Sequence, residues 1–379
     1  MNTTGKIIAA ALIVIIVAAV GAYAYMQSTQ PAANPSPSPS STASPTPAPT
    51  PTPAPTRLIV SSTTSLYETG FLNALQTAFQ AKYPWITLSF LSQGTGIAIQ
   101  TAQRGDADMI MVHDPTQETN FLVNGYGVNR RIIAYNFFVI VGPANDPANV
   151  TGMSPVDALK QIKASGEQGQ ATWVSRDDSS GTNSKEKNLW KAAGIDWNTI
   201  KNQTWYVRTG TGMTPTLQVT NENNGYTLAD LGSYLNNYNQ GNIQLKIVVQ
   251  ASKDLLNVYS VIADNPLNVN LTQTNFNAAM LFIQYMVSNE GQQMLANFGK
   301  DTVGQTLFNP YIPLLTSGSN ATLLGWIQSY AFINGTECPT TYRYNAGNLY
   351  DSPLPSIANP PSSNFITLVT ATPTASKND

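Results

Sequence analysis

Charged side chains are scarce in this sequence, where Asp, Glu, Lys and Arg make up 11 % of 379 residues against about a quarter in an average protein. The 19 Lys and Arg are outnumbered by 21 Asp and Glu, so no basic surface for nucleic acid is expected. The single cysteine, Cys338, excludes an internal disulfide framework and a cysteine-based zinc site. The single histidine, His113, argues against a metal cluster and a Ser-His-Asp triad. Because His113 follows the apolar run 109–112, we expect it to have a structural role.

The first 56 residues are not expected to belong to the fold. Residues 7–25 form an apolar run behind Lys6, long enough to span a bilayer. The short basic flank predicts that everything downstream lies outside the cytoplasm. We interpret residues 1–26 as a retained anchor, or as a signal segment cleaved near Ala24. Residues 27–56, rich in Pro, Ser and Thr, are predicted to be an extended tether.

Strands and helices alternate from Arg57 onward. Apolar runs predict strands at 58–60, 86–90, 109–112, 132–141, 243–249 and 258–262, and helical periodicity predicts helices at 71–79, after Gly94, and from a cap at Thr274. This alternation indicates an α/β fold with mostly parallel sheets flanked by helices. The length is sufficient for two lobes. In such sheets ligands bind beyond the carboxyl ends of the strands.

Two phrases rich in Ser and Thr follow predicted strands. They are Ser61–Ser65, called the first loop below, and Ser175–Thr182, called the second loop. A strand that leads through hydroxyl residues into a helix offers hydroxyl donors, free backbone N–H groups and the positive end of the helix dipole. The pair therefore predicts a receptor for a small tetrahedral oxyanion. The alternative is that both phrases are ordinary helix N-caps.

The sequence from about Leu58 to Phe308 resembles the tungstate-binding proteins of ABC importers, which are two-lobed class II solute-binding proteins. The resemblance rests on many phrases in the same order, among them Ser62-Thr63-Thr64-Ser65, Gly94-Thr95-Gly96, Gly105-Asp106-Ala107-Asp108, Ser175-Arg176, Ser180-Gly181-Thr182 and Asn257-Val258-Tyr259.

The resemblance implies an architecture and a function. Lobe one is expected at 57–142 and 252–310 and lobe two at 143–251, because the apolar strands 132–141 and 258–262 flank the inserted segment, and the ligand is expected in the cleft between the lobes. Residues 311–379 lie outside the resemblance and are expected to form a partly disordered C-terminal extension. The implied function is extracytoplasmic capture of tungstate, with molybdate as a second ligand, by a monomer that delivers it to a permease and its ATPase. No cofactor, metal or catalytic residue is implied.

Seven ligand-binding residues are predicted on these grounds. They are Ser62, Thr63, Thr64, Thr95, Ser175, Arg176 and Thr182. Hydroxyls would replace the lost hydration of the ion, and Arg176 would add charge-assisted bonds. An internal salt bridge between Arg176 and Asp177 or Asp178 is the alternative for this arginine.

The sequence departs from the family pattern at three positions. Asp177 stands where the family usually has Gly, Asn183 where it has His, and Leu231 where it commonly has Arg. An inward carboxylate would repel a dianion, so Asp177 is predicted to face solvent.

Other classes of function remain open. An extracellular phosphatase would need a metal cluster or an activated nucleophile, which the composition argues against. A phosphate- or sulfate-binding protein of the same fold is the nearer alternative. A purely structural surface protein would explain the tether but not the two placed loops.

Overall fold

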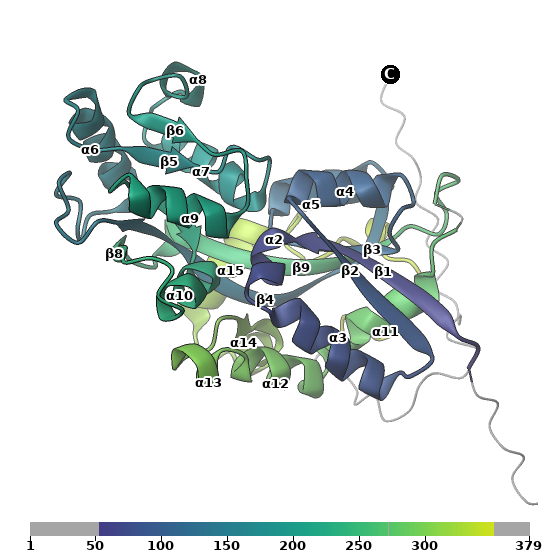
Figure 1. The fold of residues 1–379 in the computed structure, drawn as a ribbon. Helices are drawn as coiled ribbons and strands as arrows, with labels where there is room; N and C mark the ends of the chain where they lie inside the picture. Colours follow the sequence, from purple (N-terminus) through teal and green to yellow (C-terminus); the bar gives the residue numbers. More distant parts are fainter. Residues whose placement is uncertain (1–52, 272, 352–379) are drawn as a thin grey trace, which may run out of the picture. The chain divides into compact units, whose positions relative to one another are not determined.

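The computed structural model describes residues 53–271 and 273–351 (Figure 1). The predicted anchor at 1–26, most of the predicted tether at 27–56 and the end of the predicted extension lie outside the described residues. Among the described residues, none of the helices combines the length and the apolar character needed to cross a membrane.

The strands and helices alternate along most of the described chain. The strands are β1 Thr56–Thr63, β2 Ile86–Gln93, β3 Met109–Val112, β4 Gly127–Gly142, β5 Trp173–Ser175, β6 Tyr206–Arg208, β7 Thr227–Asp230, β8 Lys246–Val249, β9 Leu256–Asp264 and β10 Asn309–Pro310. The helices are α2 Thr64–Glu68, α3 Phe71–Lys82, α4 Thr95–Gln103, α5 Pro115–Val123, α6 Pro155–Glu167, α7 Gly181–Ala192, α8 Trp197–Ile200, α9 Met213–Glu222, α10 Leu231–Asn239, α11 Phe276–Val287, α12 Asn289–Asn297, α13 Lys300–Val303, α14 Tyr311–Ser317 and α15 Ala321–Ala331. Two 3-10 helices, η1 Lys253–Leu255 and η2 Thr340–Tyr342, complete the list.

The main sheet has the strand order β10-β4-β9-β3-β1-β2. Strands β2, β1 and β3 are parallel, as the alternation predicts, and so are β5 and β6 in a second sheet. Around β4 and β9 the pairing is antiparallel, and five of the eight pairings between the described strands are antiparallel, so the sheets are mixed rather than mostly parallel as predicted. The long strand β4 pairs with β9 up to Phe137 and with β7 from Phe138 onward, so that one strand runs through two neighbouring sheet regions.

The larger group of buried side chains surrounds β1, β3, β9 and the first half of β4. Leu58 and Val60 point to the cluster that contains α3 and α11, whereas Ile59 packs with α4 and α5 on the other face. Because side chains alternate along a strand, apolar residues at successive positions bury both faces of the sheet. Figure 1 shows these helices on the two sides of the strands. We call this region the large part.

A second group of buried side chains lies entirely within residues 138–255, which we call the small part. Phe138 and Ile140 pack with α6 and α7, while Val139 and Val141 pack with α9 and α10. The second half of β4 therefore repeats the two-sided burial of the large part. The lobe boundaries after residues 142 and 251 stay a prediction.

Two predicted boundaries are wrong. The strand predicted at 243–249 begins only at Lys246, although Ile243 and Leu245 are buried. Helix α11 begins after Asn275 and has no side-chain cap. The hydroxyl of Thr274, the predicted cap, donates instead to the carbonyl of Leu271 at 2.9 Å.

The residues after β10 pack onto the large part. Ile327 and Ala331 of α15 and Leu349 join its core. Further along, the carboxylate of Glu337 accepts from Arg131 Nε at 3.0 Å and from the Ile132 amide at 2.9 Å. Residues 311–351 are thus held by apolar contacts and by β4.

Asp264, the last residue of β9, is fully buried and lacks partners for both carboxylate oxygens among the described residues. Its backbone amide donates to the carbonyl of Asp108, just before β3, at 3.1 Å. Burial, reinforced by the charge of Asp108, raises the pKa of Asp264 well above its ordinary value. A carboxyl group with a raised pKa stabilises the fold at low pH, and this contribution is lost as the pH rises toward the folded pKa.

We expect Asp264→Asn to unfold at a higher temperature than the parent at pH 8, because the neutral amide removes the cost of keeping this carboxyl protonated. At a pH above the folded-state pKa, each unit by which the pKa is raised lowers the free energy of unfolding by about 1.4 kcal/mol. Thermal unfolding at pH 5 and pH 8 is the measurement. The increase in unfolding temperature should be larger at pH 8 than at pH 5. An equal or smaller increase at pH 8 would contradict a raised pKa of Asp264.

Candidate anion-binding site

The first loop comprises the end of β1 and the start of α2, and the second loop leads from the end of β5 into α7. The second loop contacts the first through Arg176 and Thr64 and also packs against the start of α4. Thr95, at the start of α4, accepts a hydrogen bond through Oγ1 from the Gly181 amide at 3.1 Å. The Gly96 amide donates to the Ser179 carbonyl at 3.2 Å. A Cβ atom at Gly94 would lie 3.2 Å from the Asp178 carbonyl oxygen, closer than ordinary packing. Glycine at this position therefore permits the approach of the second loop to α4.

Arg176 is the cation where the loops meet, and 2 % of it is exposed. Its Nη2 donates to Thr64 Oγ1 at 3.0 Å, so that one side chain links the second loop to α2. Nε donates to Asp178 Oδ2 at 3.1 Å, and Nη2 bonds to the same oxygen. The ion pair with Asp178, which the sequence left open as an alternative, is present. Because a guanidinium has five N–H donors, N–H groups remain for a further acceptor.

The predicted hydroxyls fall into two groups. Ser62 Oγ donates to the Met111 carbonyl at 3.0 Å, and Ser175 Oγ donates to the buried carboxylate of Glu186 at 2.7 Å. The single hydrogen of each of these two serines is therefore used within the chain.

The threonines differ from the two serines. Thr64 and Thr95 accept hydrogen bonds from Arg176 and Gly181 respectively, which leaves their own hydrogens available. Thr182, in the first turn of α7, has a buried hydroxyl without a partner in the part of the chain that the structure describes. Thr63 caps α2, and its hydroxyl lies 3.2 Å from Ser65 Oγ.

Asp177, which was predicted to face solvent, has a side chain that is 19 % exposed and pairs with cations other than Arg176. Its carboxylate lies 3.8 Å from Lys187 Nζ and 3.4 Å from Arg208 Nη1, both partly exposed cations. The backbone at Asp177 has φ +42°, in the left-handed region that glycine occupies without steric cost. This conformation explains why a glycine suits the position in the family pattern.

We expect Asp177→Gly to be more stable than Asp177→Ala by about 1 kcal/mol, since both variants lose the carboxylate but only glycine relieves the left-handed backbone. Urea unfolding of the two variants is the measurement. The comparison with alanine removes the contribution of the exposed ion pairs, which are individually weak. Equal midpoints would show that the backbone at residue 177 is unstrained.

Several residues of this region were not found from the sequence. Glu68 of α2 accepts from the amide and the hydroxyl of Thr214, each at 3.0 Å, and joins α2 to α9. Burial raises the pKa of Glu68, with the Thr214 bonds acting against it. His113, which was expected to have a structural role, contacts Ser65, with Asn257 and Asp230 behind it. His113 and Asn257 were noted in the sequence but not assigned to the site, and no local pattern places them there, because their partners are far away in the sequence.

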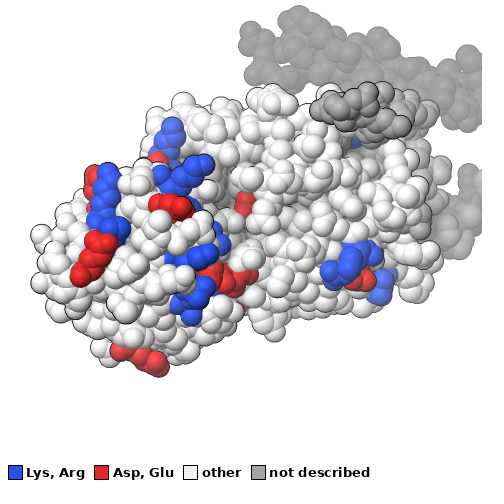
Figure 2. All heavy atoms as spheres, turned by 90° about the horizontal axis from the view of Figure 1, so that it is seen from above, with Lys and Arg blue, Asp and Glu red and all other residues white. Residues whose placement is uncertain are grey.

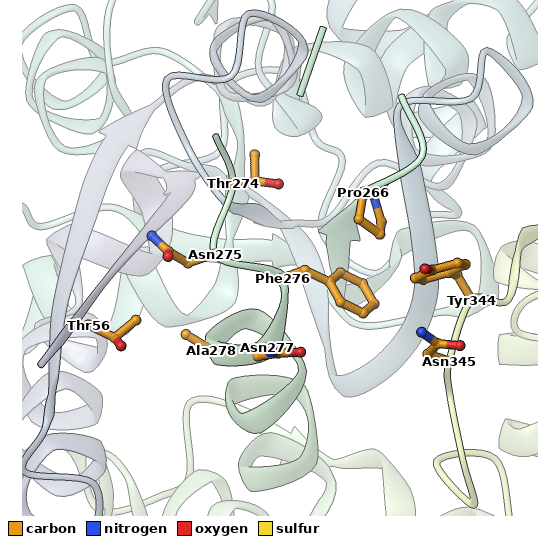
Figure 3. Close-up of a pocket in the computed structure, with 9 residues that line it drawn as sticks. All are labelled: Thr56, Pro266, Thr274, Asn275, Phe276, Asn277, Ala278, Tyr344 and Asn345. Carbon is orange, nitrogen blue, oxygen red and sulfur yellow. The ribbon is translucent and has the colours of Figure 1, made fainter. Parts of the chain in front are cut away.

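A pocket of ≈ 370 Å³ lies elsewhere in the large part (Figure 3). It is lined by Thr56, Pro266, Thr274, Asn275, Phe276, Asn277, Ala278, Tyr344 and Asn345. Thr56 begins β1 and the first loop begins at Ser61 on the same strand, so the pocket and the first loop are separated by roughly 17 Å of extended strand. The pocket has no charged lining residue and does not belong to the loop contact.

The surface carries few charges. On the face shown in Figure 2, charged side chains gather toward the end formed by α6, α7 and α8, and most of the remaining surface is neutral. The described residues also contain no group of three or more His, Cys, Asp or Glu side chains placed to hold a metal ion. The groups that meet at the two loops are hydroxyls, backbone amides and one guanidinium paired with the Asp178 carboxylate.

Comparisons with known proteins agree with this chemistry. Residues 39–290 match the family described as PBP superfamily domain. A protein of Haloferax volcanii described as an ABC transporter anion-binding protein is 42 % identical over 259 residues, which are 67 % of this chain and 71 % of the relative. The tungstate-binding protein TupA of Peptoclostridium acidaminophilum is 35 % identical over 67 % of this chain and 85 % of its own.

A solved structure of a tungstate-binding protein is also similar to this chain. The tungstate-binding protein TupA from Desulfovibrio alaskensis G20 is 37 % identical, with a TM-score of 0.56, over 67 % of this chain and 98 % of its own. The predicted α/β class, with a central sheet flanked by helices, is confirmed. The chain belongs to the PBP superfamily, together with relatives that are named for binding tungstate.

Proposed function

We propose that this protein is the extracytoplasmic substrate-binding component of an ABC importer and captures a tetrahedral oxyanion, tungstate, with molybdate as a second ligand. The observation that carries the proposal is the contact of the second loop with the first loop through buried Arg176, and with α4 through Thr95. The names of the relatives support it.

The proposed site is built from all seven predicted residues, with different roles. Thr64, Thr95 and Thr182 have hydroxyl hydrogens available to an oxyanion. Arg176 supplies the positive charge. Ser62, Thr63 and Ser175 make hydrogen bonds that fix the two loops. A dianion that leaves water needs each lost contact replaced by a donor, and such a set of neutral donors around one cation meets that need.

Phosphate is the second candidate, favoured by one observation. The carboxylate of Asp178 lies beside Arg176. Hydrogen phosphate has an O–H group that can donate a hydrogen bond to such a carboxylate. Tungstate at neutral pH carries none, and it would have to share Arg176 with Asp178 at the cost of charge repulsion.

Isothermal titration with tungstate, molybdate, sulfate and phosphate at pH 7.5 distinguishes the candidates. We expect tungstate to bind most tightly and molybdate next, with sulfate and phosphate much weaker. Tight binding of phosphate without binding of tungstate would identify phosphate, the second candidate, as the ligand. Binding of none of the four ions would refute the proposal.

We further propose that residues 7–25 anchor the protein and that 27–56 tether its body near the permease and its ATPase. A tether raises the local concentration of a binding protein around its transporter. Membrane fractionation of the native protein is the test. A wholly soluble protein that starts near Tyr25 would indicate a cleaved signal segment instead.

The lobe division at 57–142 plus 252–310 and 143–251 is likewise proposed. Two lobes are supported by the separate buried clusters of the large and small parts, although these clusters divide the chain near residues 138 and 255, a few residues from the proposed bounds. The two parts would close on the ligand, which is the motion that a transporter can detect. We also propose that the protein is a monomer, which sedimentation analysis can test.

A further inference from the structure

The single histidine of the chain is buried between the two loops. His113 follows β3, and its Nε2 lies 3.3 Å from Ser65 Oγ of the first loop. On its other side it packs against Gly181 of the second loop, where an added Cβ would lie 2.9 Å from the imidazole ring. The ring also packs beside Tyr259, with a centroid distance of 5.0 Å. His113 thus contacts both loops of the proposed anion site.

The hydrogen bonds behind His113 determine the orientation of Asn257. Asp230 Oδ2 receives hydrogen bonds from the Tyr259 hydroxyl at 2.5 Å and from Asn257 Nδ2 at 2.8 Å. A carboxylate accepts but does not donate, so the amino group of Asn257 must face Asp230. The carbonyl oxygen of Asn257 then faces His113 Nδ1 at 3.0 Å. His113 Nδ1 must therefore carry a hydrogen.

Burial, more than the charges around it, keeps the ring neutral. Burial lowers the pKa of His113, Asp230 and Asp114 act against this effect, and Arg176 adds to it. A neutral ring with a hydrogen on Nδ1 has a free electron pair on Nε2. Ser65 must donate to that electron pair, and its oxygen is then left to accept from Thr63 at 3.2 Å.

We propose that His113 is a positioning residue for oxyanion capture: its Nδ1–H tautomer, held by Asn257, fixes the directions of the Ser65 and Thr63 hydroxyls in the first loop. The ordered hydroxyls hold the first loop in its binding geometry before the ion arrives, which avoids an ordering cost on binding. The inference rests on the proposed function of the same site.

The tautomer can be measured directly because the chain has one histidine. We expect nitrogen NMR of protein labelled with ¹⁵N-histidine at pH 7.5 to show a protonated Nδ1 and an unprotonated Nε2. Ser65→Ala should leave this pattern unchanged, since Asn257 determines it. A hydrogen on Nε2 in the parent would overturn the inference.

Binding of tungstate tests the functional step. His113→Phe keeps an aromatic ring but removes both nitrogens, and we expect about tenfold weaker binding, the equivalent of one unmet buried hydrogen bond. His113→Gln, whose amide oxygen can accept from Ser65, should recover part of the loss. Adding Ser65→Ala to His113→Phe should cost little more, because the two residues act through one bond.

Each outcome has a separate meaning. Parent-like tungstate binding by a folded His113→Phe variant would overturn the positioning role. If His113→Phe fails to fold, tungstate binding by His113→Gln and by Ser65→Ala is compared with the parent instead. Parent-like binding by Ser65→Ala would then overturn the positioning role. Failure of the parent to bind any of the four oxyanions would refute the proposed function instead, whatever the tautomer.

Discussion

Arg176→Ala is expected to weaken tungstate binding by about ten- to a hundredfold or more. Hydrogen bonds to charged groups contribute about 1.5–3 kcal/mol, and this arginine is the cation that links the two loops. The variant has a second defect, because Asp178 loses its partner and its carboxylate stays beside the ion. Isothermal titration at constant salt is the measurement.

Three matched variants separate these effects. Arg176→Ala/Asp178→Ala should bind more tightly than Arg176→Ala, because the uncompensated carboxylate is gone. Arg176→Lys keeps the charge but loses the planar fork, and should be intermediate. Thr64→Val removes one neutral hydroxyl at nearly constant volume and should cost less than the loss of Arg176. Tungstate binding by Arg176→Ala at the parental affinity would mean that Arg176 serves only its ion pair with Asp178.

The strands were predictable where apolar residues are continuous. The run Met109–Val112 is β3, with side chains on both faces buried. The apolar stretch 132–141 is the major part of β4. The antiparallel pairing of β4 with β9 was not predictable from the alternation, because it depends on residues far apart in the sequence that meet only in the fold.

The candidate site was predictable as two loops, but not in its internal bonds. The phrases at Ser61–Ser65 and Ser175–Thr182 do lie at strand ends and do meet. Which hydroxyls are already used depends on distant partners, since Ser62 donates to Met111 and Ser175 to Glu186. Sequence spacing contains no information on such pairs. The left-handed backbone at Asp177 was also not predicted from the sequence, although the glycine that the family usually has at this position indicates a positive φ.

Loss of Arg130 is expected to have a large effect on stability. Arg130 and Glu118 are both fully buried, and Arg130 Nε and Nη2 donate to Glu118 Oε2 at 2.9 and 2.8 Å. Arg130 Nη1 donates to the Glu337 carbonyl at 2.8 Å, which ties the C-terminal segment to β4. We expect Arg130→Met to lose about 3–5 kcal/mol of unfolding free energy, because an unpaired carboxylate stays buried.

The pH dependence of this loss identifies its cause. Burial raises the pKa of Glu118, and the charge of Arg130 opposes the increase. Without Arg130 the pKa rises further, so the folded variant holds a proton that the unfolded chain releases. Stability contributed by such a group is lost as the pH rises. Denaturant unfolding should therefore show a larger deficit for Arg130→Met at pH 8 than at pH 5. Arg130→Met/Glu118→Leu should recover much of the loss at pH 8, though not the bond to Glu337. A double variant no more stable than Arg130→Met would mean that packing around residue 130, rather than the unpaired charge, controls the stability.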